Sequence, residues 1–110
     1  KARDSGFNYL PGGSSASEVM RGLEYGFDIF KFFPAEAVGG TTLLRSLHGP
    51  FRDVKFCATG GIGLDNVMSY LSLANVLSVG GSWITPSKLI KEKRWSEIER
   101  LASQASSLTQ

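Results

Sequence analysis

Apolar residues gather in four short runs, at about residues 7–10, 28–33, 54–58 and 76–79. Each run ends in glycine or proline and is followed by a stretch with helical spacing of apolar positions. Short continuous apolar runs are typical of strands buried on both faces, as in parallel sheets that helices cover. The pattern therefore predicts four βα units within one α/β domain that spans residues 1–110.

The stretches after the runs carry signals for helix ends. Ser14 to Ser17 offers N-cap residues for the first helix, and Gly26 closes it. Thr85-Pro86 is a helix entry, and His48 before Gly49-Pro50 is expected at a helix C-terminus. The predicted helices are Glu18 to Tyr25, about Thr41 to His48, one from near Asp65, and about Trp95 to Ala105.

Two architectures fit four such units, because both contain parallel strands joined by helical crossovers. One is an open doubly wound sheet. The other is half of a (β/α)8 barrel, whose usual size of about 250 residues is roughly twice this chain. The last two predicted strands both end in Gly-Gly shortly before a helix. Barrels often bind phosphate in the loops after their last two strands, so this feature favours the half barrel.

Lys31 lies in the middle of the second apolar run, between Phe30 and Phe32. With the two-residue period of a strand, its amine has apolar neighbours on whichever face it occupies. Burial disfavours the charged form of lysine. Such a lysine must pair with a carboxylate, extend to the end of the strand, or lose its proton at a lowered pKa and act as a nucleophile that forms a Schiff base. The pattern alone leaves these three interpretations open.

The glycine pairs Gly60-Gly61 and Gly80-Gly81 are candidates for an anion site. Without a Cβ atom, their backbone N–H groups can approach a phosphate closely, and Ser82 can add a hydroxyl group. The alternative is that both pairs serve turns that need a positive φ. Two pairs in equivalent positions favour the anion site.

Composition excludes several other classes of function. With 110 residues and a net charge of +2, the chain gives no argument for a nucleic-acid or membrane partner. The basic segment Lys88 to Arg94 is interleaved with apolar residues and predicts a solvated helix face. Cys57 is the only cysteine and His48 the only histidine, so neither an internal disulfide nor a metal site is expected. No apolar stretch reaches membrane-spanning length, and no signal-peptide pattern opens the chain.

Motifs over nearly the whole chain resemble the 2-keto-3-deoxy-6-phosphogluconate aldolases, a family that also includes enzymes acting on 4-hydroxy-2-oxoglutarate. They occur in the family's order and at similar spacing. The matching segments are Leu10-Pro11-Gly12, Phe30 to Glu36, Gly39-Gly40, Gly49-Pro50-Phe51, Phe56 to Ile62, Tyr70-Leu71 and Val79 to Trp83.

The resemblance implies a class I aldolase on a (β/α)8 TIM barrel, of which this chain supplies the last four βα units as the C-terminal half of one domain. It implies a cytoplasmic homotrimer of the Entner–Doudoroff pathway that uses no metal or other cofactor. Its substrate is a small keto-acid phosphate, 2-dehydro-3-deoxy-6-phosphogluconate, which it cleaves to pyruvate and glyceraldehyde 3-phosphate. Cleavage of 4-hydroxy-2-oxoglutarate to pyruvate and glyoxylate is a second expected activity.

The resemblance also implies roles for individual residues. Lys31 matches the Schiff-base lysine, Phe33 an aromatic residue beside the iminium, and Thr59 a threonine linked to stereochemical choice. Pro11 shapes the mouth of the barrel or simply ends a strand. The residues that match the phosphate-binding loops are Gly60, Gly61, Gly80, Gly81 and Ser82.

The chain departs from the family pattern at Ala58, where a proline is common, and at Gly13-Ser14-Ser15, which is looser than the usual segment. No residues match the family's first four units, which supply the glutamate acid/base and the arginine and threonine that bind the carboxylate of pyruvate. Glu36 lies outside the strand and is expected to make a structural contact rather than to transfer protons. This chain alone is therefore expected to be inactive.

Three hypotheses remain open. The chain is the C-terminal half of a Schiff-base aldolase, or part of another phosphate-binding barrel enzyme such as an isomerase or synthase, or a non-catalytic half barrel that binds phosphate or packs against a partner. The first and third hypotheses need the same residues in this chain, so its sequence does not separate them.

Overall fold

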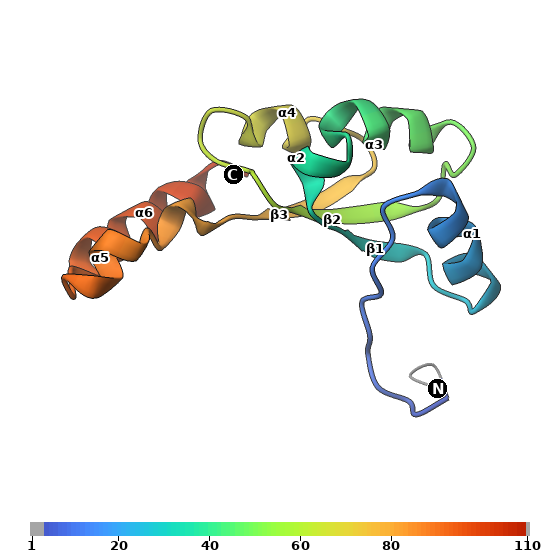
Figure 1. Cartoon of the computed structure of the whole chain (residues 1–110), viewed down its shortest axis with the longest axis horizontal. Coiled ribbons are helices and arrows are strands. Elements are labelled where there is room, and N and C mark those ends of the chain that lie inside the picture. The colour runs from blue at the N-terminus through green and yellow to red at the C-terminus, as the bar shows by residue number, and fades with distance from the viewer. Residues whose placement is uncertain (1–3, 110) are drawn as a thin grey trace.

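The fold is a three-stranded parallel sheet with helices before, between and after the strands (Figure 1). The computed structural model describes residues 4–109. In chain order the elements are α1 (Ala16–Glu24), β1 (Ile29–Phe32), α2 (Ala35–Val38), α3 (Gly40–His48), β2 (Lys55–Thr59), α4 (Val67–Leu71), β3 (Val76–Gly80), the 3-10 helix η1 (Ser82–Ile84), α5 (Ser87–Lys91) and α6 (Trp95–Ser107).

The strands lie side by side in their sequence order, β1-β2-β3, and both neighbouring pairs are parallel. Lys31 of β1 lies opposite Cys57 of β2, and Thr59 of β2 lies opposite Gly80 of β3. Parallel pairing brings the C-terminal ends of all three strands to one edge of the sheet. The predicted α/β class and three of the four predicted strands are confirmed.

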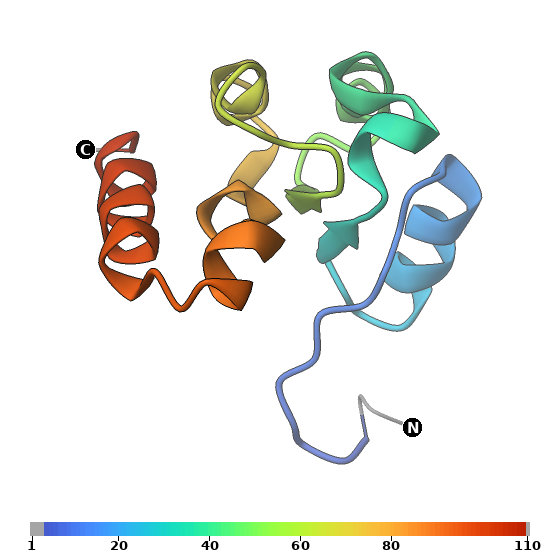
Figure 2. The same ribbon diagram turned by 60° about the vertical axis from the view of Figure 1, so that its left-hand side comes forward.

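Among the described residues, helices pack on one face of the sheet. In Figure 2 the blue, green and yellow helices α1, α3 and α4 form an arc around the strands. Phe30 and Phe32 of β1 and Phe56 of β2 point into this covered face and are completely buried. Their rings contact one another, with centroids 5.7 Å apart for Phe32 and Phe56. The core consists of these rings with residues of the surrounding helices, among them Leu44, Leu47, Val67 and Tyr70.

The prediction that β1 is buried on both faces is wrong for this chain. Burial alternates along the strand, so that Phe30 and Phe32 are buried while Ile29 and Lys31 are exposed. The physical reason is that no described element packs on the second face. Lys31 therefore has solvent around its amine rather than an apolar enclosure.

The predicted strand at residues 7–10 is not formed. The backbone pairs with β1 only further along, where Gly12 lies opposite Lys31 in a parallel bridge. Continuing that register backwards places residues 7–9 opposite residues 26–28, which precede the first residue of β1, Ile29. These apolar residues have no strand beside them to pair with, and Phe7 and Tyr9 are exposed.

The predicted helices are present, with ends shifted by one or two residues. α1 begins earlier than predicted because Ser15 is the N-cap, and its hydroxyl accepts a hydrogen bond from the Glu18 N–H. The Glu18 carboxylate in turn accepts from the Ser14 N–H, and this bond is the main reason that the pKa of Glu18 lies below its usual value. α3 ends at His48 as predicted, and Pro86 precedes α5.

The basic segment Lys88 to Arg94 is exposed except for Leu89, which confirms a solvated surface. Only part of it is helical, since α5 ends at Lys91. Within residues 4–109, none of the helices combines the length and the apolar character that crossing a bilayer requires.

The packing of α1 on the sheet leads to a stability prediction. A Cβ atom on Gly22 would lie 2.2 Å from Cε1 of the Phe30 ring, although alanine in a helix normally stabilises by about 0.5–1 kcal/mol relative to glycine. We expect Gly22→Ala to lower the free energy of unfolding by about 1–3 kcal/mol, because the buried ring must move. Urea unfolding of the complete protein is the measurement.

Gly12→Ala is the matched control, because a Cβ atom there meets no heavy atom within 4 Å. It should change the free energy of unfolding by less than about 0.5 kcal/mol. A Gly22→Ala protein more stable than the parent would contradict the close packing of α1 against Phe30.

Candidate active site

One cavity lies at the C-terminal edge of the sheet and has a volume of about 450 Å³, a size suited to a small metabolite. All eight residues that the sequence predicts as site residues line it. Their roles stay predictions, but the fold gathers them from three strands and the turns that follow. The lining consists of Lys31, Phe33, Thr59, Gly60, Gly61, Ile62, Gly80, Gly81 and Ser82.

Lys31 is the one charged side chain among these described lining residues. Its backbone is fixed on the side away from β2, because its N–H donates to the Pro11 carbonyl at 2.8 Å and its carbonyl accepts from the Gly13 N–H at 3.0 Å. Its Nζ lies 5.2 Å from the centroid of the Phe33 ring, within the range of a cation–π contact. Both ion pairs found in residues 4–109 belong to Arg94. The amine therefore faces the cavity without a carboxylate partner in the described part of the chain.

Thr59 ends β2 and carries a buried hydroxyl oxygen for which no hydrogen-bond partner is found among residues 4–109. An unpaired buried hydroxyl is unfavourable, so it is suited to pairing with a polar group of a bound molecule. The absence of a side chain at Gly80 makes room for the Thr59 side chain, since a Cβ atom on Gly80 would lie 2.8 Å from Thr59 Cγ2.

The turn Gly60-Gly61 forms one wall of the cavity in a conformation that glycine favours, with φ of 105° and 73°. It packs closely on the segment after β1, because a Cβ atom on Gly60 would lie 2.8 Å from Pro34 Cα. The peptide bond before Pro34 is cis. Within residues 4–109 no partner is found for the N–H groups of Gly61 and Ile62. These donors are available to an anion.

The second glycine pair serves close packing rather than a positive φ. Gly81 is extended, with φ of −157°, and a Cβ atom on it would lie 2.1 Å from the Trp83 ring and 2.8 Å from the Ile62 carbonyl oxygen. Ser82 then begins η1, and the structure records no partner for its N–H in the described chain. The two turns thus meet at Ile62 and line one cavity together.

Glu36 does not line the cavity. Its carboxylate accepts a hydrogen bond from the hydroxyl of Tyr70, which is completely buried. Burial raises the pKa of Tyr70 well above its usual value, and the hydrogen bond and the negative charge of Glu36 raise it further. The expected structural contact of Glu36 is present. Sequence reasoning did not find its partner, because Tyr70 lies 34 residues away.

Pro11 lies outside this cavity and acts instead through its carbonyl, which accepts from Lys31. The residue that the prediction missed is Ile62, which follows the first glycine pair and lines the cavity. No group of three or more His, Cys, Asp or Glu side chains is arranged to hold a metal ion in the part of the chain described.

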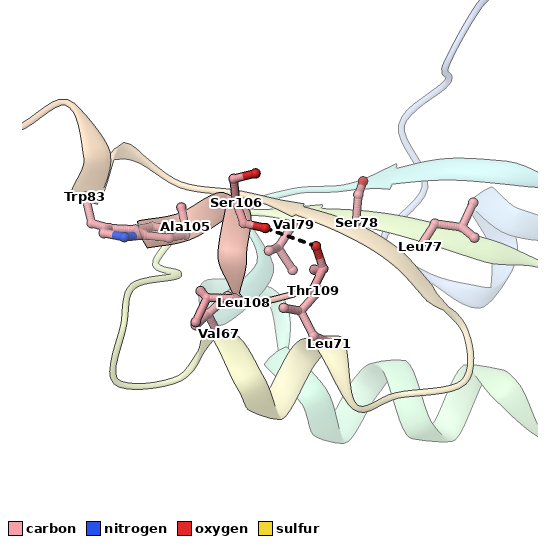
Figure 3. A pocket seen from close by; sticks show the side chains of 10 residues that line it. All are labelled: Val67, Leu71, Leu77, Ser78, Val79, Trp83, Ala105, Ser106, Leu108 and Thr109. Carbon is pink, nitrogen blue, oxygen red and sulfur yellow. Dashed lines mark hydrogen bonds between the residues drawn. The ribbon is translucent and has the colours of Figure 1, made fainter. Parts of the chain in front are cut away.

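A second cavity of about 400 Å³ lies between α4, β3 and the end of α6 (Figure 3). It is lined mainly by apolar side chains, including Val67, Leu71, Val79 and Leu108. At its rim the Thr109 hydroxyl donates to the Ser106 carbonyl. Its described lining contains none of the eight predicted site residues and no charged side chain.

The chain matches the family model described as KDPG and KHG aldolase over residues 1–101. It is 49% identical over 100 residues to 2-dehydro-3-deoxy-phosphogluconate aldolase of Pseudoalteromonas atlantica, with 91% of this chain and 46% of that protein covered. It is 47% identical over 96 residues to KHG/KDPG aldolase of Escherichia coli, with 87% and 45% covered. The chain therefore spans about half the length of the curated relatives it matches.

Solved structures agree with this relationship. A crystal structure of KDPG aldolase from Legionella pneumophila, with pyruvate captured as a covalent carbinolamine intermediate, has a TM-score of 0.91 and 47% sequence identity. The match covers 94% of this chain and 50% of the Legionella pneumophila chain. A 4-hydroxy-2-oxoglutarate/2-dehydro-3-deoxyphosphogluconate aldolase from TTHB1 has a TM-score of 0.84 at 36% identity, with 99% of this chain and 52% of that one covered.

Proposed function

The chain belongs to the KDPG and KHG aldolase family, and we propose that it forms the Schiff-base and phosphate-binding part of a class I aldolase. Its substrate is 2-dehydro-3-deoxy-6-phosphogluconate, which the complete enzyme cleaves to pyruvate and glyceraldehyde 3-phosphate. Cleavage of 4-hydroxy-2-oxoglutarate to pyruvate and glyoxylate is its second activity. The observation that carries the proposal is one cavity lined by both the lysine and the two glycine turns, in which the amine and several backbone N–H groups have no partner among residues 4–109.

In the proposed reaction the neutral amine of Lys31 attacks the C2 carbonyl of the keto acid and forms a carbinolamine. Loss of water gives an iminium ion, which accepts the electron pair of the C3–C4 bond when the C4 hydroxyl loses its proton. The aldehyde leaves, and the enamine is protonated at C3. Hydrolysis of the resulting iminium then releases pyruvate and restores the lysine.

The remaining side chains have supporting roles in this proposal. Phe33, whose ring lies 5.2 Å from Lys31 Nζ, packs beside the iminium. The unpaired Thr59 hydroxyl contacts the hydroxyl-bearing carbons and so influences stereochemistry. The substrate phosphate binds the two glycine turns and Ser82 through backbone N–H groups.

Proton transfer needs a group from the rest of the enzyme. The described residues that line the cavity include no carboxylate and no imidazole. We assign the general acid/base glutamate, and the arginine and threonine that bind the pyruvate carboxylate, to the N-terminal half that the longer relatives contain. Glu36 is excluded from this role, because it lies outside the cavity and pairs with Tyr70.

The same reasoning supports the barrel. A sheet with helices on one face and a site on the bare face has the layering of a (β/α)8 barrel wall, and we assign the chain to the last four βα units of one. The segment before α1, which bridges to Lys31 at Gly12, takes the place of the first of these four strands. The family resemblance supports a cytoplasmic homotrimer without a metal or other cofactor and without a nucleic-acid or membrane partner.

The Schiff base is tested by incubating the complete enzyme with pyruvate and sodium borohydride and mapping the adduct by mass spectrometry. We expect the reduced pyruvyl group on Lys31. Lys31→Met should abolish both the adduct and turnover, while Lys88→Met, on the exposed face of α5, serves as the matched control and should leave both unchanged. An active enzyme labelled elsewhere, or not at all, would favour an isomerase or synthase without a Schiff base.

The phosphate site is tested by Gly61→Ala. The new methyl group meets Glu36 Cβ at 2.8 Å in a backbone conformation with φ of 73°, so the turn must change shape. We expect KM for the phosphorylated substrate to rise by about tenfold or more, with a change of less than about twofold for 4-hydroxy-2-oxoglutarate. Gly49→Ala, which meets only an ordinary contact at 3.8 Å, is the control. Equal losses for both substrates would indicate a purely structural turn.

The half-barrel assignment is tested on the isolated 110 residues. The bare face and free edge of the sheet expose apolar side chains, including Phe33 and Leu77, so we expect self-association in sedimentation velocity and aldol cleavage near background. Adding the N-terminal half in trans should restore turnover. A compact monomer that cleaves substrate at a normal enzymatic rate would contradict the assignment.

A further inference from the structure

Glu36 and Tyr70 lie directly behind the glycine turn that lines the cavity. Glu36 is in the first turn of α2, and Tyr70 is in α4. A Cβ atom on Gly61 would meet both Cβ and Cγ of Glu36 at 2.8 Å, so the stem of this side chain rests against the turn. The pair is thus in contact with the cavity wall without entering the cavity.

Hydrogen bonds and close contacts connect the turn and this pair to their surroundings. The Glu36 N–H donates to the Gly60 carbonyl at 3.1 Å, and Asn66 Nδ2 donates to the Gly61 carbonyl at 3.0 Å. The carbonyl groups of Gly60 and Gly61 therefore both accept hydrogen bonds from the protein. A Cβ atom on Gly40 would lie 2.9 Å from Glu36 Oε2 and 3.2 Å from the Tyr70 hydroxyl, so the start of α3 packs against the pair.

This arrangement fixes the direction of the free donors. With both of its carbonyls held by Glu36 and Asn66, the turn cannot rotate its peptide groups without breaking a bond. The Tyr70 hydroxyl, which is protonated at neutral pH, donates to the Glu36 carboxylate and holds it in place. The Glu36 stem then blocks movement of Gly61 away from the cavity.

We propose that Tyr70 and Glu36 are positioning residues that hold the Gly60-Gly61 turn in its phosphate-binding conformation. The inference rests on the proposed function, because it assumes that this turn binds the substrate phosphate. It assigns the pair a role in selectivity for phosphorylated over unphosphorylated keto acids. Lys31 is held independently, by β1 and the 11–13 segment, so the pair should not influence Schiff-base formation.

The test uses the complete enzyme with Tyr70→Phe, Glu36→Ala and Glu36→Gln. Tyr70→Phe removes one hydroxyl and should raise KM for 2-dehydro-3-deoxy-6-phosphogluconate and the inhibition constant of inorganic phosphate by about fivefold, as the loss of one hydrogen bond suggests. Glu36→Ala also removes the stem and should raise both constants by about tenfold or more. Glu36→Gln keeps an acceptor for Tyr70 and should stay within about twofold of the parent.

Two measurements separate positioning from a general loss of structure. kcat and the rate of pyruvate trapping on Lys31 by borohydride should change by less than about twofold in all three variants. Tyr25→Phe, at the exposed end of α1, is the matched control and should change none of these quantities. If Tyr70→Phe does not fold, the Glu36→Ala and Glu36→Gln pair decides, because Glu36 is at the surface.

The positioning role is overturned if KM for the phosphorylated substrate and the phosphate inhibition constant stay at the parent values in Glu36→Ala, or if pyruvate trapping falls in parallel with them. It is also overturned if Glu36→Gln is as impaired as Glu36→Ala. A parent enzyme that pyruvate and borohydride do not label at Lys31 would instead overturn the proposed function, and this outcome is distinguishable from the others.

Discussion

The arrangement of the candidate site depends on the burial of one face of the sheet against helices. Phe30, Phe32 and Phe56 are completely buried in the covered face, and burial of such large aromatic side chains contributes strongly to stability. Because side chains alternate along a strand, this burial forces Lys31 and its neighbours of the same phase to the bare face. The position of the lysine is therefore a consequence of hydrophobic packing on the other side of the strand.

The parallel pairing of the strands is the second feature that positions the candidate site. It places the ends of β1, β2 and β3 at one edge, so an amine, a hydroxyl and two glycine turns converge there although they are distant in sequence. Glycine is needed at these turns for packing as well as conformation. Gly80 leaves room for Thr59, and Gly81 for the Trp83 ring. The glycines of the candidate anion site are therefore also required for close packing.

Much of this could be predicted from local patterns, and the failures have physical causes. The strand around Lys31 was recognisable from an apolar run ended by Pro34, and the two glycine pairs from their place after strands. Phe33 and Thr59 were predicted only through the family resemblance. The run at residues 7–10 looks equally strand-like, but strand formation needs a partner, and the register at Gly12 leaves residues 7–9 without one. The prediction that β1 is buried on both faces was wrong for a related reason. An apolar run does not tell which other elements are present to pack against each face of the strand. The pair of Glu36 and Tyr70 joins two helices and leaves no periodic signal in either.

We propose that the Lys31 amine and the two glycine turns bind one substrate in one cavity. A crystal structure of the complete enzyme, reduced with borohydride in the presence of pyruvate and then soaked with inorganic phosphate, tests it most directly. We expect a reduced pyruvyl group on Lys31 Nζ and, in the same cavity, a phosphate bound by N–H groups of Gly61, Ile62 and Ser82. A pyruvyl group on another residue, or a phosphate bound only outside this cavity, would contradict it.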